Sequence, residues 1–174
     1  MVNSVSIEKF KLKFLQTTPY ISWLKKFENI RYIGRGELFR KITVAGVRNY
    51  VQKNIKSKTN YMYLIKNQDG FPIGTAKIGN IDWYHKRGDI GIMIDREYGG
   101  CGYGSQTVSL LVDFGFSKLG LNKITGGCEC RNIAMKKVFK NNGFKLEGVL
   151  KKNTYSHSLG KFVDQAIFGI IKLK

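Results

Sequence analysis

The spacing of apolar residues predicts an alternation of strands and helices along the first third of the chain. Residues 5–14 alternate loosely between apolar and polar side chains, which is typical of a strand. Two segments then place apolar residues three or four positions apart, which predicts one helix beginning at Thr18-Pro19 and a second beginning at Thr43. The expected apolar faces are Tyr20, Trp23, Leu24 and Phe27 in the first helix and Val44, Val47, Val51 and Ile55 in the second.

The rest of the chain is expected to supply most of a sheet. The turn sequence at 67–70 predicts a hairpin, Asn132 precedes a helical pattern, and Gly143 follows that pattern as a helix-ending glycine. The order β-α-α-β-β-β-α-β-α-β-β predicts an α/β fold with helices on both faces of a mixed sheet. The later strands are expected at 61–66, 71–81, 90–94, 122–130, 144–150 and 161–171, and a loop with Tyr155 and His157 is expected to join the last two. Two later helices are also expected. The apolar face of the first consists of Val108, Leu111, Val112, Gly115 and Leu119, and that of the second consists of Met135, Val138 and Phe139.

A glycine-dense loop separates the apolar run at 90–94 from the next helical pattern. The first N–H groups of a helix lack internal partners and carry partial positive charge, and glycines let an anion approach the backbone. The order strand, glycine loop, helix therefore predicts a site for a phosphate or pyrophosphate. The ATP-binding P-loop is excluded because no lysine separates Gly104 from Ser105, and the dinucleotide motif because Ser105 replaces its third glycine. The loop consists of Gly99, Gly100, Cys101, Gly102, Tyr103, Gly104 and Ser105.

Three stretches in this half of the chain carry a family resemblance. Gly102-Tyr103-Gly104 matches the core of R/Q-x-x-G-x-G/A, motif A of the GNAT superfamily of acyl-CoA-dependent N-acetyltransferases, although Gly99 and Cys101 replace its usual polar residues. A second pattern of that superfamily, N-x-x-S/A and then a short helix ending in Gly-Phe, resembles residues 132–144. The ending at 160–169 resembles the branch that contains the ribosomal-protein alanine acetyltransferases and the sugar-amine acetyltransferases.

The resemblance implies a GNAT fold, with three α/β/α layers around a mostly antiparallel sheet, as one domain over residues 1–174. It implies an N-acetyltransferase with acetyl-CoA as cofactor. The backbone of Ile92, Met93 and Ile94 would bind the pantetheine arm, and an N–H there would polarise the thioester oxygen. The resemblance also implies that the cofactor contacts Gly99, Gly100, Cys101, Gly102, Tyr103, Gly104, Ser105, Asn132, Met135 and Phe139. It implies that the acceptor contacts Arg31, Tyr32, Arg35 and Glu37. These four residues also fit a solvated loop.

The usual general acid of the family is missing from this sequence. The family commonly places Ser where Met135 stands, or Tyr where Phe139 stands, and neither Met nor Phe donates a proton. Three interpretations follow. Tyr155 or a water protonates the leaving thiolate, or the thiolate leaves unassisted, or the fold is retained with little catalysis.

Three residues are candidates for the general base that deprotonates the amine. Glu129 is flanked by Cys128 and Cys130, and a carboxylate among apolar neighbours holds a proton more tightly, as a base requires. It also fits a strand carboxylate that pairs with a lysine. Asp82 and His85 lie in the connection before the 90–94 strand, which borders the acceptor site in the family, and a histidine titrates near neutral pH.

Composition limits the cellular setting and the possible partners. The 174 residues suit one domain, and no apolar run approaches the ~18 residues of a membrane span. The first residues lack a signal-peptide pattern, and three cysteines do not form a disulfide framework, so we expect a cytoplasmic protein. The sequence has only two histidines, and the Cys128-x-Cys130 spacing does not suit a zinc site, so no metal is expected. Cys101 precedes a helix and is a candidate reactive thiol.

The charge of the chain influences the choice of acceptor. Thirty Lys and Arg against 12 acidic residues give a net charge of +18, which favours anionic partners. The lysines are scattered, so we expect no specific nucleic-acid binding, and a lysine-rich composition alone explains the charge equally well. We therefore expect the acceptor to be a small-molecule or peptide amine, and we favour a nucleotide-linked amino sugar or a protein N-terminus over a polyamine. We expect the protein itself to be a monomer or homodimer. The alternative is a module that binds CoA or RNA without acetyl transfer.

Overall fold

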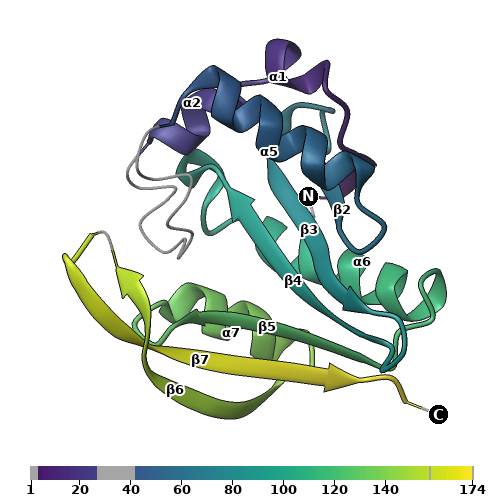
Figure 1. Cartoon of the computed structure of the whole chain (residues 1–174), viewed down its shortest axis with the longest axis vertical. Coiled ribbons are helices and arrows are strands. Elements are labelled where there is room, and N and C mark those ends of the chain that lie inside the picture. The colour runs from purple at the N-terminus through teal and green to yellow at the C-terminus, as the bar shows by residue number, and fades with distance from the viewer. Residues whose placement is uncertain (1–3, 27–41, 157, 174) are drawn as a thin grey trace.

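The strands form one seven-stranded sheet. The computed structural model describes residues 4–26, 42–156 and 158–173 (Figure 1). The strand order is β1-β2-β3-β4-β5-β7-β6, and all neighbours are antiparallel except β4 and β5. The strands are β1 (Val5–Lys9), β2 (Tyr61–Asn67), β3 (Pro72–Asp82), β4 (Arg87–Ile94), β5 (Lys123–Glu129), β6 (Lys145–Ser156) and β7 (Lys161–Ile171).

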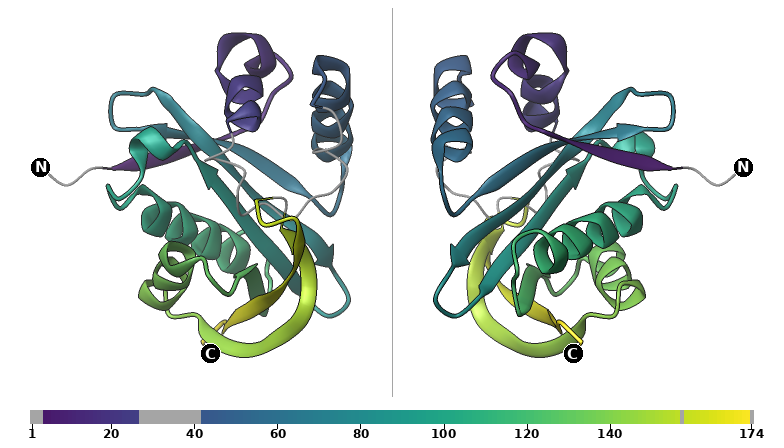
Figure 2. Two further views of the ribbon diagram at one scale, coloured as in Figure 1. Left: turned by 90° about the vertical axis from the view of Figure 1, so that its left-hand side faces the viewer. Right: turned by 90° about the vertical axis from the view of Figure 1, so that its right-hand side faces the viewer.

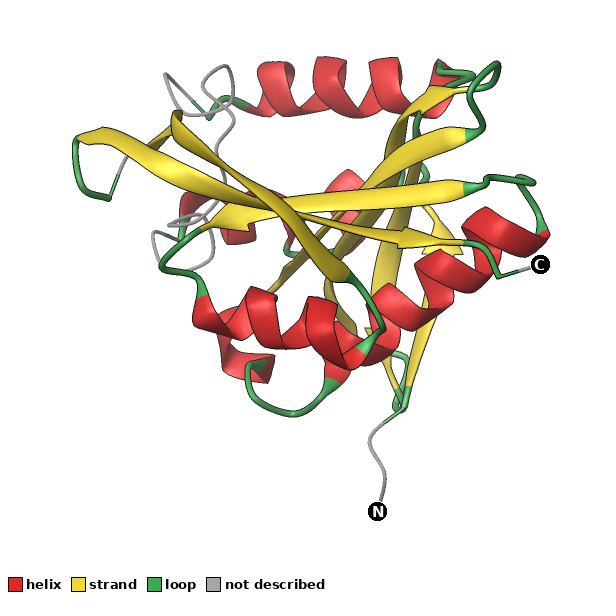
Figure 3. Cartoon of the chain, turned by 90° about the horizontal axis from the view of Figure 1, so that it is seen from below, coloured by secondary structure: helices red, strands yellow, loops and turns green. Residues whose placement is uncertain are grey.

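Helices cover both faces of this sheet, which confirms the predicted mixed α/β architecture (Figure 3). Successive side chains of a strand point to opposite faces. In β4, Ile90 therefore packs in the core beneath α6 and α7, whereas Met93 packs in the core beneath α1, α2 and α5. The described helices are α1 (Phe14–Thr17), α2 (Tyr20–Lys25), α5 (Val44–Lys56), the short 3-10 helix η1 (Arg96–Tyr98), α6 (Tyr103–Ser117) and α7 (Ile133–Asn141).

The start of the chain differs from the prediction of a strand over residues 5–14. The strand ends at Lys9, and a short helix, α1, begins at Phe14. The chain turns there because Phe10 and Phe14 both pack in one core, with ring centroids 5.5 Å apart. Thr18 does not cap α2, since its Oγ1 donates to the carbonyl oxygen of Phe14 and closes α1 instead.

The helix predicted after Thr43 is present as α5. The Thr43 Oγ1 accepts a hydrogen bond from the Gly46 N–H at 3.0 Å, as an N-cap residue does. Val47 and Val51 are completely buried against the sheet. Val44 was predicted on the same face but is exposed, because the first turn of the helix extends past the edge of the core.

The parallel pair β4 and β5 separates after three residues. The ladder joins Arg87, Gly88 and Asp89 to residues 123–125, and no pair joins residues 90–94 to β5. Beyond Asp89, β4 stays paired with β3, while β5 stays paired with β7 as far as Glu129. The two strands consequently diverge toward the glycine loop, as seen in Figures 1 and 2, and the sheet opens into two halves.

The last hairpin extends further than the predicted strand at 144–150. The register shifts between Leu150 and Thr154, where Lys152 has a positive φ of 47°. The Asp164 carboxylate accepts from the Lys152 N–H at 2.9 Å and bridges this irregularity. Pairing therefore continues to Ser156, and Tyr155 lies in β6 rather than in the predicted loop.

Candidate active site

A large open cleft occupies the gap between β4 and β5. Its volume is about 1230 Å³. One wall is the β4 segment at 90–94, and the other is β5 at 125–129. The glycine loop and the beginning of α6 close the end where the strands are furthest apart, and α7 lines the cleft along most of its length. The cleft therefore unites the strand, loop and helix residues that the family resemblance assigned to cofactor binding.

The glycine loop turns sharply so that α6 begins at the cleft. Gly100 and Gly102 have φ values of 79° and 83°, a conformation that side-chain-bearing residues rarely adopt. Gly102 is the N-cap residue of α6, so the first N–H groups of that helix face this end of the cleft. The predicted loop residues line the cleft except for Cys101, which is exposed and donates to the carbonyl oxygen of Gly99. The geometry suits an anionic group such as a pyrophosphate.

α7 supplies the second helical wall of the cleft. The Asn132 Oδ1 accepts from the Met135 N–H at 3.0 Å, as predicted for an N-cap residue. At the other end of α7, Asn142 Nδ2 donates to Ser105 Oγ at 2.9 Å and joins α7 to the beginning of α6. This hydrogen bond, which the sequence did not predict, holds the two cleft-lining helices together.

The predicted cofactor residues Met135 and Phe139 both line the cleft. Phe139 is 1% exposed and stacks on Phe168 with a centroid distance of 5.1 Å. A Cβ at Gly126 would lie 2.5 Å from the Phe139 ring, so a glycine is required opposite it. Phe139 is thus an apolar wall without a proton to donate.

The residues of the cleft fit coenzyme A. Ile92, Met93 and Ile94 line it along the edge of β4 that β5 does not pair. The backbone groups on that edge can accept an extended amide-containing chain as if it were another strand. The glycine loop and the beginning of α6 provide for its phosphates. Both requirements are met within one continuous cavity.

Glu129 is buried in the cleft, but its surroundings are not purely apolar as the sequence suggested. Its Oε2 accepts from Arg131 Nε at 2.6 Å. The same guanidinium donates through Nη2 to Ser156 Oγ at 2.8 Å and to Ser158 Oγ. The carboxylate is therefore ion-paired, and its partner is connected to the β6–β7 hairpin. Sequence reasoning missed Arg131, although an arginine two residues beyond a strand carboxylate was a usable signal.

The other two candidate bases and the candidate acid do not line the large cleft. Asp82 is the last residue of β3, and the His85 N–H in the following turn donates to its Oδ1 at 2.9 Å and lowers the pKa of the carboxyl. The His85 side chain is exposed and lies against Tyr84. Tyr155 is 42% exposed and packs edge-on against Phe162. None of these three residues therefore shares the cleft lining with Glu129 and the glycine loop.

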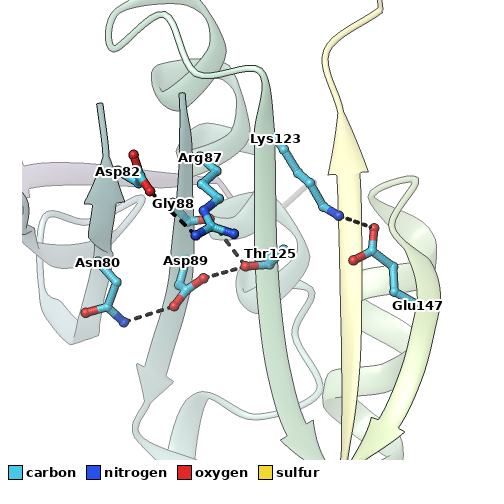
Figure 4. A pocket seen from close by; sticks show the side chains of 8 residues that line it. All are labelled: Asn80, Asp82, Arg87, Gly88, Asp89, Lys123, Thr125 and Glu147. Carbon is cyan, nitrogen blue, oxygen red and sulfur yellow. Dashed lines mark hydrogen bonds and ion pairs between the residues drawn. The ribbon is translucent and has the colours of Figure 1, made fainter. Parts of the chain in front are cut away.

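Asp89 was not singled out from the sequence, yet it borders two cavities. It lines the large cleft and also a smaller cavity of about 460 Å³ at the closed end of the strand pair (Figure 4). Its carboxylate accepts from Thr125 Oγ1 across the parallel ladder and from Asn80 Nδ2 at 2.9 Å. Its position at the last ladder pair depends on strand register, which the sequence alone does not reveal.

The remaining predictions concern acceptor contacts, thiols, metals and membranes. The predicted acceptor residues Arg31, Tyr32, Arg35 and Glu37 lie outside the described residues. Burial raises the pKa of the Cys128 thiol to about 11. In the described part of the chain, no group of three or more His, Cys, Asp or Glu side chains could hold a metal ion. No described helix is both long enough and apolar enough to span a membrane.

The fold and the cleft define an acetyltransferase domain. A family profile described as "Acetyltransferase (GNAT) domain" matches residues 12–145. The chain belongs to this family, as its motifs predicted. The narrower resemblance to the ribosomal-protein alanine and sugar-amine branch is not established by this match.

Relatives of known sequence carry N-acetyltransferase names. An uncharacterized N-acetyltransferase, p20, from Bacillus licheniformis is 29% identical over 119 residues, which are 68% of this chain and 66% of the relative. The spermidine N(1)-acetyltransferase of Escherichia coli K12 is 28% identical over 98 residues, 56% of this chain and 52% of the relative. The matches thus span about half to two thirds of the length of these relatives.

Solved structures share the fold over nearly their whole length. A spermidine N-acetyltransferase from Vibrio cholerae, in complex with CoA and spermine, superposes with a TM-score of 0.86 at 17% identity and covers 96% of this chain and 95% of its own. A ribosomal alpha-N-protein acetyltransferase, RimL, in complex with coenzyme A, has a TM-score of 0.84 at 21% identity and covers 97% and 94%. At these identities the likeness establishes the fold alone.

Proposed function

We propose that this protein is an N-acetyltransferase that transfers the acetyl group of acetyl-CoA to a primary amine. One observation carries the proposal: the unpaired edge of β4, the glycine loop and the beginning of α6 line the same cleft of about 1230 Å³. An extended chain that ends in a pyrophosphate needs both features in this order. Membership of the acetyltransferase family is consistent with this function.

The chain supplies binding groups for each part of the cofactor. The first N–H groups of α6, after Gly102, bind the pyrophosphate, and the backbone of residues 92–94 binds the pantetheine arm. The bound cofactor supplies an acetyl thioester. A β4 N–H donates to the thioester oxygen and stabilises the negative charge that grows on it during transfer. Asn132 holds the first turn of α7 against the cofactor through its bond to the Met135 N–H.

Glu129 is the proposed proton acceptor for the attacking amine. Among the described residues that line the cleft it is a buried carboxylate, and Arg131 holds its Oε2 in one position. Arg131 is therefore a positioning residue. Met135 and Phe139 cannot protonate the thiolate, and Tyr155 lies outside the cleft lining. We propose that the thiolate leaves without a protein acid.

The missing acid also supports a second candidate function, a module that binds CoA without transferring its acetyl group.

Two features of the chain favour different acceptors. The net charge of +18 favours an anionic acceptor, such as a nucleotide-linked amino sugar or an acidic protein N-terminus. The carboxylates of Asp89 and Glu129 in the cleft favour a cationic amine. Surface charges are screened beyond about 8 Å at physiological ionic strength, so groups in contact with the acceptor decide its class. We therefore place a cationic amine ahead of the amino sugar and the N-terminus.

The proposed cofactor site is tested by thermal melting with and without CoA. A ligand that binds only the native state raises the melting temperature. Gly102→Leu should abolish the shift, because a side chain there enters the space of the pyrophosphate, whereas the protein itself has room for it. Gly120→Leu is the matched control, since Gly120 also has a positive φ and open space but lies at the far end of α6. No shift in the wild type at millimolar CoA would contradict the proposal.

The transfer reaction is tested by consumption of acetyl-CoA against a panel of amines. The panel contains linear diamines, monoamines, an amino sugar linked to a nucleotide, and a peptide with a free N-terminus. Acetylation of at least one amine is the expected result. A CoA-dependent melting shift without transfer to any amine would favour the second candidate, a binding module.

A further inference from the structure

One side of α7 faces the cleft along the length of the helix. Residues three and four positions apart lie on the same side of a helix. Ala134, Val138 and Asn141 follow this spacing, and all three line the cleft. Lys137 lies one turn before Asn141 and lines the cleft as well. This side of α7 therefore adds an ammonium group to the cleft wall.

The same side of α7 packs against the beginning of α6, where the pyrophosphate is proposed to bind (Figure 2). A Cβ at Gly104 would lie 3.5 Å from Val138 Cγ2. Asn142 Nδ2 donates to Ser105 Oγ at 2.9 Å. Lys137 directly precedes Val138, so its backbone lies one residue from the contact between α7 and the proposed pyrophosphate site.

The Lys137 ammonium is available to an anionic ligand. The side chain is exposed and forms no hydrogen bond or ion pair with any residue that the structure describes. Among the described residues that line the cleft, the other two cations, Lys77 and Arg96, each interact with other groups of the protein. Neither the glycine loop nor α7 contains an acidic residue. Glu97, just before the loop, pairs with Lys26 at 2.7 Å.

Coenzyme A has a second anionic group beside its pyrophosphate, the 3′-phosphate on its ribose. The ribose is bonded to the pyrophosphate, so the two anionic groups are one sugar apart. The partial positive charge of a helix terminus acts only within the first turn, so the beginning of α6 serves one of these groups. A lysine, with a compact charge on a flexible stem, commonly binds a phosphate. The 3′-phosphate thus matches the charge and the position of Lys137.

We propose that Lys137 binds the 3′-phosphate of coenzyme A and thereby selects the acyl donor. The preferred donor is then a free acyl-CoA that has its 3′-phosphate. A thioester of dephospho-CoA lacks this group, and so does an acyl-phosphopantetheine attached to a carrier protein. This inference rests on the proposed acetyltransferase function and adds a residue that determines donor specificity within the same cleft.

The test compares CoA with dephospho-CoA by isothermal titration calorimetry, because these ligands differ only in the 3′-phosphate. The wild type should bind CoA ~10-fold more tightly, the lower end for a hydrogen bond to a charged group, since Lys137 is exposed. Lys137→Met keeps a long apolar stem but removes the charge, so the affinity ratio should fall towards one through weaker binding of CoA. Lys140→Met is the matched control, because Lys140 is exposed on the same helix but does not line the cleft.

Lys137→Arg retains the positive charge and should retain most of the preference for CoA. A lysine that contacts the pyrophosphate, or one with a purely structural role, would instead affect both ligands equally in Lys137→Met. That result, an unchanged affinity ratio in Lys137→Met, or equal affinity of the wild type for the two ligands would overturn the inference and leave the proposed function intact. Failure of the wild type to bind CoA would overturn both.

Discussion

At the scale of single residues, the proposed chemistry of the cleft depends on one ion pair of unequal exposure. The Glu129 side chain is 2% exposed, whereas that of Arg131 is 30% exposed. Removing the arginine would leave a buried carboxylate without its cation, and such a change usually costs more than the pair contributes. The pair thus couples the position of the proposed base to the stability of the fold.

Arg131→Met should lower the free energy of unfolding by ~3 kcal/mol, the lower end for breaking a buried pair, because solvent partly screens the guanidinium. Urea denaturation measures the change. The double variant with Glu129→Gln should recover part of the loss, since no charge then remains buried. Equal losses in the single and double variants would show that the arginine acts through packing alone.

Glu129→Gln preserves shape and removes the proposed base, so it should lower kcat more than it raises the KM for CoA. Tyr155→Phe is the control, because Tyr155 lies outside the cleft lining, and it should change kcat little.

With no protein acid, the rate should rise with pH through one ionisation and show no falling limb. A ~100-fold loss in Tyr155→Phe would instead identify that hydroxyl as the acid.

At the scale of elements, edge strand β1 is joined to β2 by charge as well as by backbone pairing. Glu8 accepts from Lys66 Nζ of β2 at 2.7 Å and from Lys11 Nζ at 2.8 Å. The hydrogen bonds from Lys11 and Lys66 lower the pKa of Glu8 from 4.5 to about 2. Because the folded-state pKa is depressed, the stability that Glu8 contributes is present above pH 4.5 and is lost as pH falls towards 2.

Glu8→Gln should therefore be less stable than the wild type above pH 4.5, and the difference should disappear near pH 2. Unfolding by urea across this range measures it. Asp113→Asn, whose carboxylate is exposed, is the control. A difference between Glu8→Gln and wild type that does not vary with pH would contradict the proposed linkage.

At the scale of the whole molecule, the net charge of +18 acts over distance but without sequence selectivity. Scattered lysines can contact phosphates but do not read bases. RNA binding should therefore be weak, indifferent to sequence, and much weaker at 200 mM than at 50 mM salt. Fluorescence anisotropy with two unrelated oligonucleotides tests this expectation. Tight binding of only one of them at physiological salt would favour an RNA-binding function.

Much of the fold could be predicted because it depends on local patterns. The Thr43 and Asn132 caps each bond to an N–H three residues away, so the sequence near them is sufficient. The turn of the glycine loop can likewise be predicted from its own residues, since only glycine readily adopts the φ values of Gly100 and Gly102. The predicted Thr18 cap was wrong because the Thr18 Oγ1 donates to the carbonyl oxygen of Phe14, and Pro19, not Thr18, is the N-cap residue of α2.

The sequence by itself thus determined most of the order of elements, most of the apolar faces and the turn of the glycine loop. Only the tertiary structure decided where β4 and β5 part, which placed Asp89 at the base of the cleft and left Tyr155 outside its lining. It also linked Arg131 to Ser156, 25 residues away. The physical reason is that periodicity shows which face of a strand is apolar, whereas register and partner depend on packing between segments far apart in the chain.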